Sequence, residues 1–178
     1  MNEHFSEPPP LDDTNRAILR HLQHDARMPN SELARRVDLS APGVQKRLQK
    51  LEESGLIDRY VAIVDREKAG FDLLCFIQVN LQRHEVQVVE AFRAAVQAMP
   101  EVLECYHLTG ETDYLLKVAL RNRKHLEHFL LEQLTPAPGV DKIRTSLVLS
   151  DVKVSTALPL ESTYPPNGSS PTPGGPPT

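Results

Sequence analysis

Capping signals in residues 30–57 constrain the fold of this chain more than any other feature. Asn30 stands where an N-cap is expected, before a short apolar stripe. Ser40 can cap a second helix, with Pro42 in its first turn, where the missing amide proton costs nothing. Gly55 then follows as a C′ residue. The apolar stripes are Leu33, Ala34 and Val37, then Val44, Leu48 and Leu51. Two helices joined by a three-residue connection predict a helix-turn-helix.

The same stretch carries a local positive charge. Between Arg27 and Lys50 there are six basic and two acidic residues, a net charge of +4, whereas the whole chain carries −4 at pH 7. A local excess of this kind favours a DNA-binding surface, and Gln and Lys side chains suit the major groove. From charge alone, an ordinary solvated helix pair remains open. The residues predicted to contact DNA are Arg35, Arg36, Ser40, Pro42, Gln45, Lys46, Arg47, Gln49 and Lys50.

Composition bounds the remaining possibilities. The 178 residues suffice for one or two domains, and no run approaches the roughly 18 apolar residues of a membrane span. The N-terminus lacks the pattern of a secretory signal. Cys75 and Cys105 show neither zinc spacing nor a disulfide framework. We therefore expect a cytoplasmic protein with free thiols, no membrane contact and no cofactor.

The first half of the chain reads as one winged helix-turn-helix domain, residues 11–64, after a flexible lead at 1–10. Asp12 is predicted to cap a helix whose inner face, Ile18, Leu19 and Leu22, completes a three-helix core. Alternating residues from Ile57 to Val64 predict the strand that a winged variant needs. Residues 65–71, charged and containing Gly70, are expected to be the hinge.

The second half has the element order of a ferredoxin-like βαββαβ domain, which makes the chain an α+β protein. Strands are predicted at 73–81, 102–109, 113–120 and 140–150, and helices at 85–99 and 123–134, the second capped by Asn122. In this topology the strands of Cys75 and Cys105 are not neighbours, which argues against a disulfide. The domain is taken as residues 72–156, and the Pro/Gly-rich residues 157–178 are expected to be disordered.

Strand parity predicts which face of this sheet lies under the helices. One parity carries most of the apolar side chains: Cys75, Ile77, Val79, Leu81, Tyr114, Leu116, Val118, Leu120, Ile143, Leu147 and Leu149. The other parity is mixed, with Leu74, Phe76 and Gln78 as an example. Since two helices cover only one face of such a sheet, burial of the mixed face against a second copy predicts a homodimer.

These segments resemble the Lrp/AsnC (leucine-responsive, feast/famine) family of prokaryotic transcription regulators. The matching stretches are L-D-D-T-N-R-A-I-L (11–19), D-A-R-M (25–28), N-S-E-L-A-R-R-V-D-L-S (30–40), V-x-x-R-L-x-x-L-E-x-x-G-L-I (44–57) and V-L-E-C-Y-H-L-T-G-E-T-D-Y-L-L (102–116). Asn15 replaces the Asp of the family pattern. The resemblance covers residues 11–150 and implies a sequence-specific DNA-binding regulator that senses a small metabolite, with dimers that assemble into octamers.

The resemblance also implies an amino-acid effector bound near the loop Thr109, Gly110, Glu111, Thr112 and Asp113. Gly110 allows close approach of the backbone, turn amides can hold a carboxylate, and Asp113 can take an ammonium group. The alternative is a plain hairpin turn with Gly and Asp as turn formers. His107, just before the loop, either fills a strand position or lines the effector pocket.

Other features of the sequence give weaker evidence for a metal site or for catalysis. His125 and His128, and likewise His21 and His24, lie three residues apart but lack the further ligands of a metal site. No catalytic triad, phosphate loop or pair of catalytic carboxylates is visible, so we predict that the chain is not an enzyme. Two rivals remain: an enzyme of the same architecture, similar to sirohaem decarboxylases, and a sensor subunit that does not bind DNA.

Overall fold

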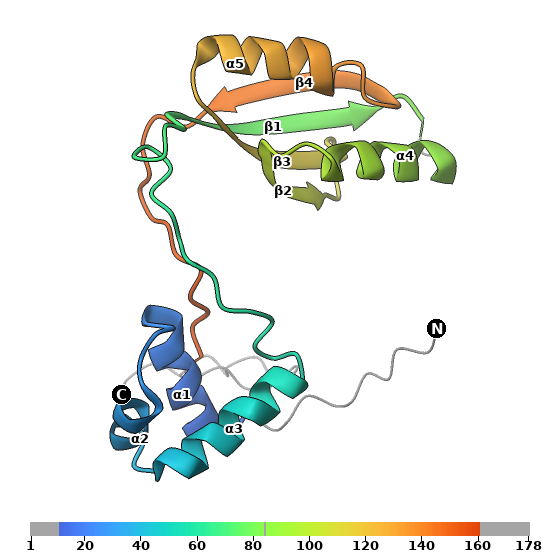
Figure 1. Ribbon diagram of the computed structural model, residues 1–178. Helices are drawn as coiled ribbons and strands as arrows, with labels where there is room; N and C mark the ends of the chain where they lie inside the picture. Colours follow the sequence, from blue (N-terminus) through green and yellow to red (C-terminus); the bar gives the residue numbers. More distant parts are fainter. Residues whose placement is uncertain (1–10, 84, 161–178) are drawn as a thin grey trace, which may run out of the picture. The chain divides into compact units, whose positions relative to one another are not determined.

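The computed structural model describes residues 11–83 and 85–160 of the chain. Its contacts form two compact units (Figure 1). One unit holds the described residues up to Ala62 together with those from Val154 onward, and the other is Ile63–Lys153. The predicted lead, residues 1–10, lies outside the described residues.

The first unit is built from three helices, α1 (Asp13–His24), α2 (Asn30–Arg36) and α3 (Ala41–Glu53). Their apolar stripes meet in one core, in which Ile18, Leu33 and Val44 are fully buried. Asp12 caps α1 by accepting a hydrogen bond from the Asn15 amide at 2.7 Å. These helices form for the reasons expected from the sequence: an amphipathic stripe on each helix, with side-chain caps on α1 and α3.

Two local expectations for this unit are wrong. The N-cap of α2 is Pro29, not Asn30, and no side chain caps that helix. Residues 57–64 form no strand within the described chain. Ile57 packs on the helical core, but Val61 and Ile63 are 65% and 80% exposed. A strand needs a partner for its backbone groups, and none of the described residues pairs its backbone with this segment.

The chain returns to the helical unit after the sheet. Leu160 packs against the three-helix core, and Leu158 is hydrogen-bonded to Gln23 of α1. Residues 154–156 are therefore grouped with the helices rather than with the predicted 72–156 domain. Residues 157–160, expected to be disordered, make these contacts, and 161–178 lie outside the described residues.

The second unit is the expected βαββαβ sheet domain. Its strands are β1 (Leu73–Leu81), β2 (Val102–His107), β3 (Tyr114–Leu120) and β4 (Val140–Leu147). They form one antiparallel sheet in the order β2-β3-β1-β4. The helices are α4 (Val86–Gln97) and α5 (Arg123–His128), and α5 continues as a π-helical turn, η1 (Phe129–Leu134). Since β3 lies between β2 and β1, the two cysteines are on separate strands, and both are free.

The core of this unit follows the predicted parity. Side chains of β1 and β3 at alternate positions, such as Ile77 and Leu116, are fully buried under Phe92 of α4 and Phe129 of η1. The prediction fails at the end of β4, because the strand stops at Leu147, and Leu147 and Leu149 are 53% and 97% exposed.

Residues 65–71, expected to be the hinge, form a hydrogen-bonded turn that is grouped with the second unit. Asp65 accepts a hydrogen bond from the Lys68 amide at 3.1 Å, and the Arg66 side chain donates to the Phe71 carbonyl at 3.1 Å. The Arg121 guanidinium lies 5.1 Å from the centre of the Phe71 ring. The boundary between the units lies earlier, between Ala62 and Ile63.

Candidate DNA-binding helix and ligand loop

The helix-turn-helix is held together by burial on its inner side. Leu33 and Ala34 of α2 are buried against Val44, Leu48 and Leu51 of α3. The turn between the helices contains Asp38 with a positive φ of 52°, a conformation that Asp adopts more readily than most residues. Ser40 caps α3 through the Gly43 amide at 3.2 Å. The inner face therefore fixes which α3 side chains point outward.

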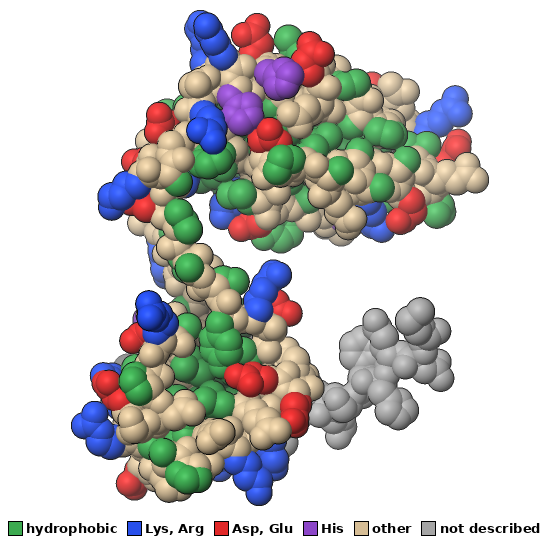
Figure 2. Space-filling model, viewed as in Figure 1, with side chains coloured by type: hydrophobic (Ala, Val, Ile, Leu, Met, Phe, Trp, Pro, Cys, Tyr) green, Lys and Arg blue, Asp and Glu red, His purple; other side chains and the backbone are tan. Residues whose placement is uncertain are grey.

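Of the nine residues predicted to contact DNA, eight are exposed and one is not. The exposed residues are Arg35, Arg36, Ser40, Pro42, Gln45, Lys46, Gln49 and Lys50. Arg36 is paired with Glu32 at 2.7 Å, and Gln49 donates to Glu53 at 2.7 Å. Lys and Arg side chains stand out on the surface of this unit (Figure 2). The outer face of α3 presents both hydrogen-bonding and positively charged side chains.

Arg47 is the exception, because it is half-buried and held by α1. Its Nη1 lies 2.7 Å from Asp12 Oδ2 and 2.9 Å from Asn15 Oδ1. The hydrogen bond from Arg47, with that from the Asn15 amide, lowers the pKa of Asp12. Arg47 therefore links the start of α1 to the middle of α3. The sequence placed Arg47 among the residues predicted to contact DNA and did not predict Asp12 as its partner.

A groove of about 460 Å³ runs along this contact. Lys46 and Lys50 line it together with Asp12, Asn15 and Arg47. Positive side chains beside a helix suit a phosphate oxygen. In the sequence, the i, i+4 spacing of Lys46 and Lys50 is the feature that indicates this groove, because it places both side chains on one side of a helix.

The loop 109–113 connects β2 to β3 and is fixed to the end of β1. Gly110 has a φ of 118°, which an L side chain rarely adopts. The Leu108 amide donates to the Asp113 carbonyl at 2.8 Å. Asp113 Oδ2 accepts the Leu81 amide at 2.8 Å, and Asn80 donates to the Glu111 carbonyl at 2.5 Å. Thr109, Gly110 and Glu111 are exposed, whereas Thr112 and Asp113 are half-buried.

Two histidines of the sheet unit, His125 and His107, have ordinary neighbours. His125 Nε2 lies 3.0 Å from Glu101 Oε1, and His107 stacks on Tyr114 with ring centres 4.8 Å apart. Among the described residues, no three His, Cys, Asp or Glu side chains gather to hold a metal ion. In the same part of the chain, no helix is long and apolar enough to cross a membrane.

These parts define a class of protein: a helix-turn-helix joined to a ligand-binding βαββαβ domain. A family model described as winged helix-turn-helix DNA-binding matches residues 11–58, and one described as Lrp/AsnC ligand binding domain matches residues 74–158. The chain belongs to the Lrp/AsnC family of DNA-binding transcriptional regulators.

Individual relatives agree with this assignment. The leucine-responsive regulatory proteins of Rhizobium meliloti and Escherichia coli K12 are 39% and 37% identical, over 80% and 85% of this chain and 92% and 93% of their own. Transcriptional regulator AzlB of Bacillus subtilis is 32% identical over 85% of this chain and 96% of its own. These relatives are transcriptional regulators, so the enzyme alternative is set aside.

Solved structures give the same result. The transcriptional regulator NMB0573 of Neisseria meningitidis, in complex with L-Met, has a TM-score of 0.81 and 40% identity, covering 84% of this chain and 97% of that chain. Escherichia coli AsnC has a TM-score of 0.76 and 27% identity, covering 82% and 97%.

Proposed function

We propose that α3 reads DNA in the major groove with Gln45, Lys46 and Gln49. The exposed outer face of α3 carries this proposal, because its amide and ammonium groups can reach base edges. Gln49 has to leave Glu53 to do so. The phosphate contacts come from Arg35, Arg36 and Lys50, with Ser40 and Pro42 at the start of the helix. Arg47 positions α3 through Asp12 rather than contacting a base.

The sensing domain is proposed to respond to an amino acid at residues 109–113. The relative NMB0573 was solved with L-Met, which supports this ligand class. Gly110 leaves its backbone open, with nothing within 4 Å of where a Cβ would stand. The turn amides then hold the ligand carboxylate and Asp113, already accepting the Leu81 amide, supplies negative charge for the ammonium. Thr109, Glu111 and Thr112 border the same opening.

Self-assembly belongs to the same proposal. The open face of the sheet carries Phe76 and Tyr106, 37% and 51% exposed, and apolar side chains of this size favour burial against a second copy. The exposed apolar residues Val61, Ile63 and Val64 offer a further contact. We propose a homodimer that assembles into octamers in the cytoplasm, where amino-acid binding changes the spacing of the reading helices along DNA.

An operator-binding series tests DNA reading. Fluorescence anisotropy with a footprinted operator should show binding by the wild type that weakens as salt rises. Lys46→Ala and Gln49→Ala should each weaken it by about tenfold, since a good base contact is worth roughly 1–3 kcal/mol. Lys68→Ala, an exposed lysine in the sheet unit, is the control and should bind as the wild type does. If all three variants bound the operator as tightly as the wild type, the proposal that Lys46 and Gln49 read bases would be wrong.

A ligand screen tests sensing separately. Thermal unfolding with each of the twenty amino acids should show at least one that raises the melting temperature, because a ligand bound only to the folded state stabilises it. Thr109→Ala should reduce that shift while leaving operator affinity in the absence of ligand unchanged. The loop is the wrong site if the shift survives Thr109→Ala and Glu111→Ala.

A further inference from the structure

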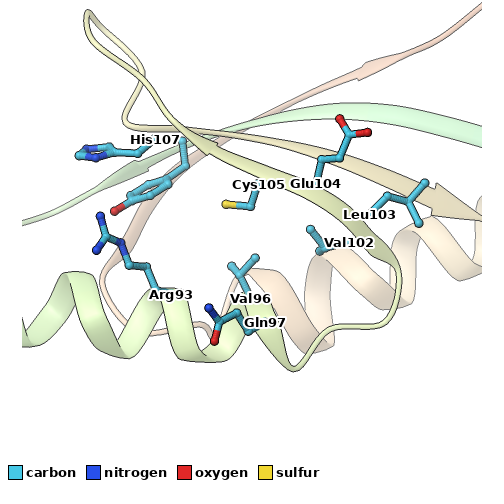
Figure 3. A pocket seen from close by; sticks show the side chains of 9 residues that line it. Arg93, Val96, Gln97, Val102, Leu103, Glu104, Cys105 and His107 are labelled. Atoms are coloured by element: carbon cyan, nitrogen blue, oxygen red, sulfur yellow. The ribbon is translucent and has the colours of Figure 1, made fainter. Parts of the chain in front are cut away.

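A second cavity lies between α4 and the edge strand β2, apart from the exposed loop residues 109–111. Its volume is about 450 Å³, within the range of about 300–1,000 Å³ of small-molecule sites. Helix α4 contributes Arg93, Val96 and Gln97, and β2 contributes Val102, Cys105 and His107 (Figure 3). Neither the DNA-binding helix nor the proposed amino-acid loop uses this α4–β2 groove.

One end of the α4–β2 groove is polar. Tyr114 is 2% exposed, with its ring between those of Phe92 and His107, each 4.8 Å away centre to centre. Among the described residues, none accepts a hydrogen bond from its hydroxyl. Arg93 extends from α4 into the groove (Figure 3), and a hydrogen bond to Tyr114 is the largest cause that raises the pKa of Arg93. A buried O–H donor without an acceptor carries a desolvation cost, which a ligand oxygen would remove.

Arg93 is well placed to act on a ligand. It also pairs with Glu90 one turn earlier on α4, at 2.9 Å, and both side chains are about half exposed. Such surface pairs contribute little and exchange readily. The Arg93 guanidinium can therefore leave Glu90, which stays in solvent, and donate a hydrogen bond to a ligand carboxylate.

The other end of the groove is apolar, and the groove as a whole lacks available negative charge. Val96 and Val102 form its aliphatic wall. Among the described residues that line it, the one carboxylate is Glu104, which is bound to Lys117 and Tyr106 at 2.9 Å each. Burial raises the pKa of the Cys105 thiol despite the opposing charge of Arg93, so the thiol stays neutral at pH 7. An anion is favoured here, because the one carboxylate among the described lining residues is already engaged and is not free to meet an ammonium group.

We propose that the α4–β2 groove binds a small monocarboxylate with a short aliphatic chain, its carboxylate at Arg93 and the Tyr114 hydroxyl and its chain on Val96 and Val102. Because no carboxylate among the described lining residues is free, the groove favours a 2-oxo acid over the corresponding amino acid. The site is a second input, distinct from the loop at 109–113. A regulator with both would sense an amino acid and its deaminated form separately.

Isothermal titration of the full chain tests the proposal with three probes at constant ionic strength: 4-methyl-2-oxopentanoate, L-leucine and sodium sulfate. The 2-oxo acid should bind one site per chain. Arg93→Gln should weaken it by about tenfold or more, the loss expected for a hydrogen bond to a charged group. Arg83→Gln, which removes an exposed arginine outside the groove, should leave it unchanged. Tyr114→Phe keeps the ring and should weaken binding severalfold.

Each other outcome overturns part of the proposal. Binding of the 2-oxo acid that survives Arg93→Gln, or no binding at all, refutes the site. Equal binding by sulfate refutes the role of the aliphatic wall. Leucine binding weakened equally by Arg93→Gln refutes the preference against ammonium. Loss of DNA affinity or of the Thr109-dependent thermal shift concerns the proposed function instead, so the two ideas fail separately.

Discussion

The side-chain amide of Gln23 in α1 is hydrogen-bonded twice to the main chain of Leu158. The Leu158 amide donates to Gln23 Oε1 at 2.6 Å, and Gln23 Nε2 donates to the Leu158 carbonyl at 3.2 Å. Two residues later, Leu160 packs on the helical core. The helical unit therefore includes a segment that the chain reaches only after completing the sheet.

Replacing Gln23 should release this segment. Gln23→Ala removes both hydrogen bonds, and since they are exposed to solvent the loss should be about 1 kcal/mol of unfolding free energy. The sharper readout is amide hydrogen exchange, which should become faster at Leu158. Arg20→Ala, at an exposed position of the same helix, is the control. Unchanged exchange at Leu158 in Gln23→Ala would mean that the segment is held by other contacts.

The link between Asp12 and Arg47 makes a second prediction. Asp12 both caps α1 and holds Arg47 at 2.7 Å. Asp12→Ala should cost about 1–2 kcal/mol, the range for loss of a helix cap, and should also weaken operator binding because α3 loses a support. Asp13→Ala is the matched control, since Asp13 is 91% exposed and pairs with Arg16 on its own helix. Equal effects of the two variants would contradict the positioning role of Asp12.

The sign of the pH effect follows from the same contact. Folding lowers the pKa of Asp12 below its usual 3.8, chiefly through Arg47. The stabilisation is therefore present above about pH 4 and is lost as pH falls through the lowered pKa. Denaturation curves of wild type and Asp12→Ala should converge in acid. A difference that persists below the lowered pKa would show that the cap acts without its charge.

Glu101 makes an analogous prediction for the sheet unit. Burial acts to raise its pKa, but hydrogen bonds from His125, its own amide and Gln133 outweigh burial and lower the pKa below 4.5. Glu101→Gln should destabilise the domain by about 1 kcal/mol at pH 7. That difference should shrink as pH falls through the lowered pKa. Glu127→Gln, at an exposed position of α5, is the control and should change neither the stability at pH 7 nor its pH dependence. If the stability difference between Glu101→Gln and the wild type did not vary with pH, the Glu101 carboxylate would not stabilise the fold through its charge.

The sequence predicts periodic and local features of this protein well. Caps such as Asp12 and Ser40, and strand β1 at its observed bounds, follow from neighbouring residues alone. What it misses depends on partners distant in sequence. The strand expected at 57–64 finds no pairing strand among the described residues, and Arg47 meets Asp12 across 35 residues. The α4–β2 groove likewise arises only when β3 brings Tyr114 beside β2.

Gly139 should tolerate no side chain, for two separable reasons. Its φ of +76° disfavours an L residue, and an added Cβ would stand 2.2 Å from Val88 Cγ1. Gly55 has a similar φ of +73° with nothing within 4 Å, so Gly55→Ala measures the backbone cost alone, about 1–2 kcal/mol. Gly139→Ala should cost about 1–3 kcal/mol more because of overpacking. Chemical denaturation gives both free-energy costs when unfolding of the helical unit is followed for Gly55→Ala and unfolding of the sheet unit for Gly139→Ala.

A double variant separates the clash from the backbone conformation. Val88 is half-buried, so Val88→Ala alone should be only mildly destabilising. In Val88→Ala/Gly139→Ala the Cγ1 atom is gone, and the extra cost of the Gly139 substitution should fall to that seen at Gly55, a coupling that neighbouring residues commonly show. Additive costs in the double variant would mean that the backbone conformation, rather than contact with α4, is what excludes a side chain at position 139.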